Sequence, residues 1–115
     1  MTLKEFMSEL LDTQELISIF ENGCSEFMKN PSQQMLAYCG KVVKKYMSDF
    51  DIGGIKLCRV YAVSYRTNGN VYTLVYEFTD KRNFLYLSPN AQHTQLIITK
   101  EIPDYLKIEA SVKIK

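Results

Sequence analysis

The hydrophobic pattern of this chain changes its period at Gly53-Gly54, and this change limits the fold more than any other feature. Before the two glycines, apolar residues recur three or four positions apart, as they do along one face of a helix. After them, apolar and polar residues alternate, as they do on a strand with one buried face. The sequence therefore predicts an α+β chain, with helices over residues 1–50 and an antiparallel sheet over residues 55–114.

The helical part is expected to contain two or three helices. Thr2 and Glu5 have the spacing of a capping box, and Asp12 with Glu15 repeats that spacing, with Asp in the cap position. We therefore interpret residues 1–28 as two short helices rather than one bent helix.

A stronger helix is predicted over roughly residues 31–49. Pro31 suits the first position of a helix, where its missing amide would be unpaired in any case, and Asn30 can cap it. All of these helices are expected to pack on one face of the sheet.

The sheet is predicted to be a meander of five antiparallel strands. Asn68-Gly69 is a strong hairpin signal between two alternating segments. A two-residue turn there sets Tyr61 opposite Tyr76 and Tyr65 opposite Tyr72. These tyrosines would share the sheet face that the helices cover.

The last two strands are expected over residues 95–102 and 105–114, joined at Pro103-Asp104. A three-residue loop would place Glu101 opposite Lys107 and would direct Leu106, Ile108, Ala110, Val112 and Ile114 to the helices.

A chain of 115 residues is expected to form a single domain, residues 1–115. Its formal net charge of +1 does not indicate a general attraction to polyanions. Nucleic-acid binding remains a second alternative, through the helix side that carries Lys41, Lys44 and Lys45.

Three cysteines without a CxxC motif are expected to be free thiols, which fits a cytoplasmic protein. No signal peptide or membrane span is predicted. Lysine outnumbers arginine 11 to 3, a bias that A/T-rich coding DNA produces and that points to a bacterial or phage origin.

No pattern of catalytic residues stands out. His93 is the sole histidine, and the cysteines do not have the spacing of metal ligands. The glycines lack the context of a phosphate-binding loop. We therefore expect no catalytic residue, no metal and no cofactor, and thus a protein that is not an enzyme.

The most distinctive surface feature is the acidic N-terminal part. Residues 1–28 contain six acidic residues against Lys4 alone, which gives a local net charge of −5. Such a face would attract a protein with a basic surface. Phage or bacterial inhibitors of the immunity or anti-defence type work in this way. The expected contact residues are Glu5, Glu9, Asp12, Glu15 and Glu21, with Phe84 and Tyr86 as apolar anchors.

Phe84 and Tyr86 belong to a second sheet face that is also rich in apolar residues. An uncovered apolar face would favour a homodimer or another partner, unless a helix or the loop over residues 88–94 crosses it. An alternative function is a small-ligand or enzymatic domain of the cone-shaped α+β type. Its pocket would be lined by Tyr61, Tyr65, Tyr72 and Tyr76.

Overall fold

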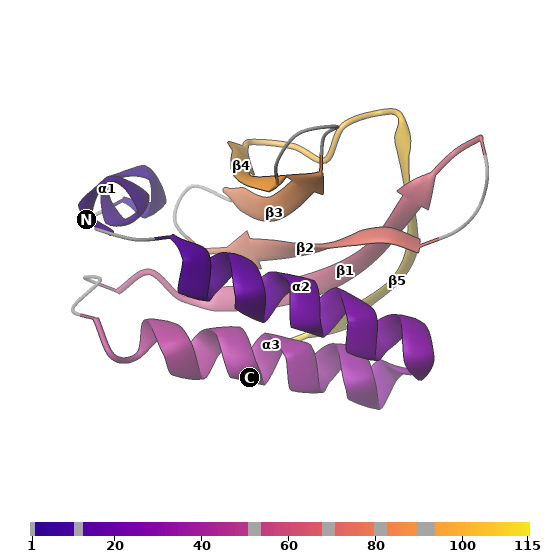
Figure 1. Cartoon of the computed structure of the whole chain (residues 1–115), viewed down its shortest axis with the longest axis horizontal. Coiled ribbons are helices and arrows are strands. Elements are labelled where there is room, and N and C mark those ends of the chain that lie inside the picture. The colour runs from indigo at the N-terminus through magenta and orange to yellow at the C-terminus, as the bar shows by residue number, and fades with distance from the viewer. Residues whose placement is uncertain (1, 11–12, 51–53, 68–70, 80–82, 90–93) are drawn as a thin grey trace.

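The computed structural model of the chain describes residues 2–10, 13–50, 54–67, 71–79, 83–89 and 94–115. Within these residues, three helices precede five strands and pack against the sheet (Figure 1). The helices are α1 (Leu3–Glu9), α2 (Gln14–Lys29) and α3 (Gln33–Met47). The strands are β1 (Leu57–Tyr65), β2 (Val71–Phe78), β3 (Phe84–Pro89), β4 (Thr94–Thr99) and β5 (Leu106–Lys113). The predicted α+β class is confirmed.

Side-chain hydroxyls cap two of the helices. Thr2 Oγ1 accepts a hydrogen bond from the Glu5 amide at 3.1 Å, and Glu5 Oε1 accepts one from the Thr2 amide at 3.0 Å. This is the predicted capping box. At α3, the Ser32 side chain accepts a hydrogen bond from the Met35 amide at 3.1 Å. The cap of α3 is therefore Ser32, and the prediction of Asn30 is wrong.

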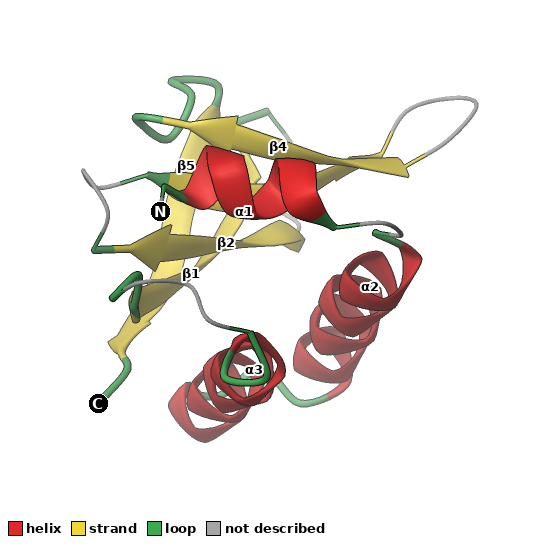
Figure 2. Ribbon diagram, turned by 90° about the vertical axis from the view of Figure 1, so that its left-hand side faces the viewer, coloured by secondary structure: helices red, strands yellow, loops and turns green. Residues whose placement is uncertain are grey.

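The two N-terminal helices are separate, as predicted. Thr13 precedes α2, and the expected cap Asp12 lies outside the described residues. The Phe6 ring of α1 meets Phe50 edge to face, with ring centroids 5.3 Å apart, which joins α1 to the segment after α3. α2 and α3 lie side by side below the sheet, whereas α1 runs in a different direction (Figure 2).

The strand order across the sheet is β4-β3-β2-β1-β5, with every neighbouring pair antiparallel. The first four strands form the predicted meander, but β5 pairs with β1 instead of β4. The predicted pairing of Glu101 with Lys107 is therefore wrong. An alternating pattern defines the faces of a strand and not its partner, so β5 could have joined either outer strand.

The register between β1 and β2 also differs from the prediction. Tyr61 pairs with Val75, and Tyr76 pairs with Val60. Irregularities lie between Leu57 and Arg59 and between Val63 and Ser64. Each bulge moves the pairing by one residue, and a shift of one residue exchanges the two faces of a strand.

The larger hydrophobic core lies between the helices and one face of the sheet. β1 contributes Leu57, Val60 and Ala62 to this core rather than its tyrosines, because of the register shift. Tyr76 of β2 is 1 % exposed and packs on Phe20 of α2, with ring centroids 4.4 Å apart. The sheet residues buried in this core are Leu57, Val60, Ala62, Leu74, Tyr76, Phe78, Leu85 and Leu87.

α3 lies close to the sheet at Gly40. A β-carbon at this position would lie 2.5 Å from Ile114 Cδ1 and 2.9 Å from Val60 Cγ2. A larger residue would therefore push the helix away from β1 and the end of the chain. The glycine is needed here for the packing distance rather than for a special backbone angle.

A second, smaller core covers the other sheet face. Val63, Val75, Phe84, Tyr86 and Leu106 are buried there, and half-buried Tyr61, Tyr65, Ile97 and Ile102 pack around them. Ile102 comes from the connection between β4 and β5. This connection crosses from one outer strand to the other and helps to cover the face.

A bulge in β5 divides that strand between the two cores. Ala110 pairs with Ala62, whereas Ile108 pairs with Val63, so Glu109 is the extra residue. The prediction that all five alternate residues face the helices is therefore wrong for Leu106, which joins the second core, and for Ile108, which is 49 % exposed. Glu109 Oε1 accepts a hydrogen bond at 2.6 Å from the buried Ser64 hydroxyl.

Candidate functional site

The described acidic residues that are expected to bind a partner are exposed and are distributed over two helices. Glu5 and Glu9 lie on α1, and Glu15 and Glu21 lie on α2. Asp12 lies outside the described residues. Glu5 is held in the capping box of α1. Because α1 and α2 run in different directions (Figure 2), the structure does not arrange these residues as one stripe.

Three of the acids keep their charge available to an approaching molecule. No ion pair within the described part of the chain involves Glu9, Glu15 or Glu21. Glu26 on α2 lies 3.8 Å from Lys29 Nζ, but both side chains are more than half exposed, so this pair is weak. α2 therefore presents negative charge that the rest of its surface does not neutralise.

A groove of about 350 Å³ lies between α2 and α3. Ile19 and Val42 supply its apolar walls, and Gly23 leaves room between the helices because it has no side chain. The Cys39 thiol, below the groove, donates a hydrogen bond to the Gly23 carbonyl at 3.4 Å. The groove is thus built from both helices and does not depend on the sheet.

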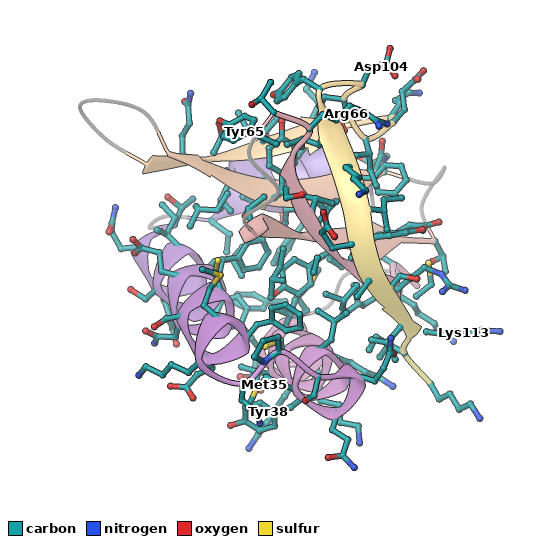
Figure 3. The ribbon with its side chains drawn as sticks, turned by 90° about the vertical axis from the view of Figure 1, so that its right-hand side faces the viewer. Met35, Tyr38, Tyr65, Arg66, Asp104 and Lys113 are labelled. Carbon is teal, nitrogen blue, oxygen red and sulfur yellow. The ribbon has the colours of Figure 1, made fainter. Side chains whose placement is uncertain are left out.

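Two residues beside this groove were not among the expected contact residues. Tyr38 of α3 lines it and is 58 % exposed, and Glu26 of α2 lines it from the other side. Glu15 lies four residues before Ile19, on the same side of α2. The sequence carried a signal for Tyr38, since this aromatic residue falls outside the apolar stripe of its helix. Figure 3 shows Tyr38 and Met35 at the outer side of α3.

Glu21 belongs to another part of α2. It lies seven residues before Met28, and two helical turns place the two residues on the same side. Met28 is 51 % exposed. Among the described acids expected to contact a partner, Glu15 alone lies on the groove side of α2, one turn before Ile19, and it does not itself line the groove.

Phe84 and Tyr86, the expected apolar anchors, are part of the second core. They are 6 % and 4 % exposed, because β1, β2 and the connection to β5 cover them. Little of either side chain is left for a partner. The same burial reduces the apolar surface that this sheet face could offer to a second copy of the chain.

The connection between β4 and β5 is fastened to the end of β1. Arg66 Nε donates a hydrogen bond to the Asp104 carbonyl at 2.7 Å, and the Arg66 amide donates one to the Tyr105 carbonyl at 3.1 Å. Tyr65 stacks on Tyr105 with ring centroids 6.0 Å apart. Figure 3 shows Tyr65, Arg66 and Asp104 together at this end of the molecule, far from Tyr38.

The four tyrosines of the alternative pocket do not line one hollow. Tyr76 lies under the helices, while Tyr61 and Tyr65 lie on the opposite sheet face. The side chain of Tyr72 lies outside what the structure describes. The sheet itself therefore separates Tyr76 from Tyr61 and Tyr65.

The lysines of the nucleic-acid alternative are exposed on α3. The ammonium groups of Lys41 and Lys45 form no hydrogen bond or ion pair with another described residue. Lys44 Nζ donates a hydrogen bond to the Lys115 carbonyl at 2.7 Å. Lys44 also lines a second hollow, between the end of α3 and the start of β1.

The thiols of α2 and α3 are poorly suited to nucleophilic chemistry. Burial raises the pKa of Cys24, and burial together with the charges of Cys24 and Glu26 raises the pKa of Cys39 to about 11. Both therefore stay protonated near neutral pH, and a thiol is a weaker nucleophile than a thiolate. All three cysteines are free, and Cys24 and Cys58 are half-buried.

Within the described ranges, no three His, Cys, Asp or Glu side chains gather as metal ligands. No helix in these ranges has the length and apolar character of a membrane span. His93 lies outside these ranges. The chain matches no protein-family model, no curated protein and no solved structure. Its function has to be inferred from its own surfaces and hollows.

Proposed function

We propose that this protein is not an enzyme and acts by binding another protein through the groove between α2 and α3. The observation that carries the proposal is Tyr38, an aromatic side chain that is 58 % exposed at the edge of this apolar groove. Tyrosine is enriched among the residues that contribute most to binding energy, because its ring is large and its hydroxyl can form a hydrogen bond. A neighbouring hollow gives the partner a place to insert an apolar side chain.

Charge supports a partner with a basic surface. Glu15 and Glu26 lie on the groove side of α2, and Glu15 has no ion pair with a described residue. Basic residues of the partner would gain attraction from both carboxylates without displacing a strong internal pair. Exposed charges of this kind act mainly on the rate of association, which falls as salt is added.

Binding of this kind would inhibit a partner whose basic surface is its working site. A basic active site or nucleic-acid groove would be covered by α2 and α3, and no bond would need to be made or broken. The proposed role is therefore that of a phage or bacterial inhibitor of the immunity or anti-defence type.

The test compares two charge reversals of equal size on the tagged full chain. Glu15→Arg with Glu26→Arg changes the groove, whereas Glu9→Arg with Glu21→Arg changes the net charge equally and lies away from the groove. Proteins recovered from bacterial extract are quantified for the wild type, for both reversals and for Tyr38→Ala. We expect one protein that the wild type and the Glu9/Glu21 variant retain and that the other two variants lose.

The affinity for that protein is then measured directly at two salt concentrations. Tyr38→Ala should weaken it by about thirtyfold, equivalent to about 2 kcal/mol. Equal losses in both charge reversals would show a general effect of net charge and would contradict the groove as the contact. Recovery of the same proteins by the wild type and Tyr38→Ala would reject the proposal. Circular dichroism of each variant shows whether the fold is retained.

A further inference from the structure

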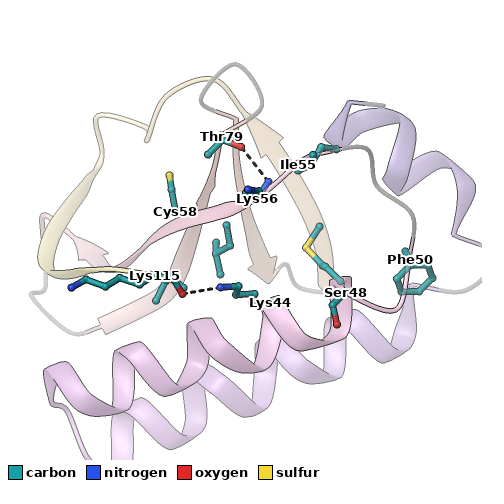
Figure 4. A pocket seen from close by; sticks show the side chains of 12 residues that line it. Lys44, Ser48, Phe50, Ile55, Lys56, Cys58, Thr79 and Lys115 are labelled. Atoms are coloured by element: carbon teal, nitrogen blue, oxygen red, sulfur yellow. Dashed lines mark hydrogen bonds between the residues drawn. The ribbon is translucent and has the colours of Figure 1, made fainter.

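A second hollow, of about 700 Å³, lies where the end of α3 meets the start of β1 and the end of the chain (Figure 4). Met47, Leu57 and Ile114 form its apolar part. Each of these residues is at least nine-tenths buried and also belongs to the main core. The hollow therefore has a fixed apolar wall, and its size is typical of small-molecule sites.

The charged side chains among the described lining residues of this hollow are all lysines. Lys44, Lys56 and Lys115 line it, and no acidic side chain occurs among its described lining residues. The ammonium group of Lys44 is positioned by its hydrogen bond to the Lys115 carbonyl at 2.7 Å. Lys56 is positioned through its backbone, since its amide donates a hydrogen bond to Thr79 Oγ1 at 3.1 Å. Figure 4 shows both hydrogen bonds at the border of the hollow.

The C-terminal end of α3 would repel an anion if its last carbonyl groups faced the hollow freely. They do not, because nearby groups occupy them: the Asp49 amide donates a hydrogen bond to the Tyr46 carbonyl, and the Phe50 amide donates one to the Met47 carbonyl. The Ser48 amide donates hydrogen bonds to the carbonyls of Lys44 and Lys45, and its hydroxyl donates one to Lys45 at 2.6 Å. The positive charge of the lysines is thus the main electrostatic feature of this hollow.

We propose that this hollow binds a small amphipathic anion, with an apolar body against Met47, Leu57 and Ile114 and an acidic group near Lys44 and Lys56. The apolar body would bury the apolar surface that still lines the hollow, including part of Phe50, which is 38 % exposed, and this burial is favourable in proportion to the area covered. The acidic group would receive hydrogen bonds from lysine ammonium groups. The site is independent of the groove between α2 and α3 and of any protein partner.

Cys58 provides a reporter inside the chain. It lines the hollow and is half-buried, whereas Cys24 on α2 is half-buried elsewhere. A bound molecule should protect Cys58 from alkylation by N-ethylmaleimide and leave Cys24 unchanged. Mass spectrometry of the full chain after timed alkylation measures both rates in one sample.

The probe is sodium decanoate below its micelle concentration, with acetate and decanol as controls for its two halves. We expect decanoate to slow the alkylation of Cys58, and both controls to be weaker at the same concentration. Lys44→Gln with Lys56→Gln should weaken decanoate binding by about threefold to tenfold, as expected for two exposed charge contacts. The matched variant Lys41→Gln with Lys45→Gln changes the net charge equally outside the hollow and should bind as the wild type.

Each other result rejects part or all of the proposal. Unchanged alkylation of Cys58 would show that the hollow does not bind the probe. Equal protection by decanol would reject the role of the lysines, as would equal losses in the two lysine variants. Protection by phosphatidylglycerol vesicles without protection by decanoate would assign the surface to a membrane, and protection by a polyglutamate peptide alone would assign it to an acidic protein.

Discussion

Tyr61 on β1 donates a hydrogen bond to the carboxylate of Glu77 on β2, across the sheet face that carries the second core. Glu77 is 8 % exposed, so this bond supplies a donor to an acidic group that water hardly reaches. The predicted register did not pair these two residues, because it set Tyr61 opposite Tyr76 and so placed Glu77 on the other face of the sheet. The interaction leads to the first of five predictions.

Tyr61→Phe should destabilise the fold by about 1–2 kcal/mol, because it leaves a buried carboxylate with one hydrogen bond fewer. Urea unfolding measures the difference. Tyr105→Phe is a suitable control, since Tyr105 is 54 % exposed and keeps its ring stacking with Tyr65. Equal effects of the two substitutions would show that the bond to Glu77 contributes nothing.

Stability should decrease in alkaline solution. Burial, with the hydrogen bond and charge of Glu77, raises the pKa of Tyr61 to about 12, and burial raises the pKa of Cys39 to about 11. The folded chain therefore holds these protons more tightly than the unfolded chain. The free energy of unfolding should stay constant up to about pH 9.0, the ordinary pKa of the thiol. It should fall as the pH rises further, through the raised pKa values of Cys39 and Tyr61. Urea unfolding at increasing pH tests this, and a rise in stability over that range would contradict it.

Tyr76→Phe should leave the protein equally stable or stabilise it by about 1 kcal/mol. The Tyr76 hydroxyl is buried and has no hydrogen-bond partner within the described part of the chain. Burial raises its pKa well above the usual value. Phenylalanine keeps the contact with Phe20 and removes the unsatisfied hydroxyl. A loss of more than about 1 kcal/mol in thermal or urea unfolding would reveal a partner of the hydroxyl.

The effect of Gly23→Ala on the free energy of unfolding should depend on the hydroxyl of Tyr76. An added β-carbon would lie 3.2 Å from the Tyr76 hydroxyl, which offsets the gain of about 1 kcal/mol that alanine gives in a helix. In the Tyr76→Phe background that contact is absent, and the gain should appear. A double-mutant cycle by urea unfolding measures the coupling between the two positions. Additive effects would mean that the hydroxyl does not limit position 23.

Gly40→Ala should destabilise the protein by about 1–3 kcal/mol, in spite of the better helix propensity of alanine. The added methyl group would overlap with Ile114 and Val60, which both belong to the core. Gly23→Ala in the Tyr76→Phe background is the matched control, since it also adds one methyl group inside a helix. A stabilised Gly40→Ala variant would show that α3 can move away from β1 without cost.

The helices were predictable because their signals are local. The capping box at Thr2 and the apolar stripe of α3 depend on residues three or four positions apart, and the structure confirms both. Alternation likewise identified every strand. Tyr38 could have been noticed as an aromatic residue outside the stripe of its helix.

The sheet pairing was not predictable from the same signals. Bulges at Val63 and Glu109 move the register without changing the local composition, and they reassign Tyr61, Leu106 and Ile108 to another face. The second hollow could not be predicted for the same reason, since it depends on contacts between distant parts of the chain. The hollow beside Lys44 and Lys56 exists because β1 and the end of the chain meet α3 there, and no sequence spacing encodes that meeting.

The position of β5 affects how the chain can fold. β1 obtains its second neighbour from a strand that is distant along the chain, so helices and the β1–β4 meander can assemble while one side of β1 still exposes bare amides and carbonyls. In such an intermediate β1 is an unpaired edge strand, to which a strand of a second molecule can pair. The crossing from β4 to β5 therefore shields the protein against strand exchange between copies, and cleavage within it would remove that protection.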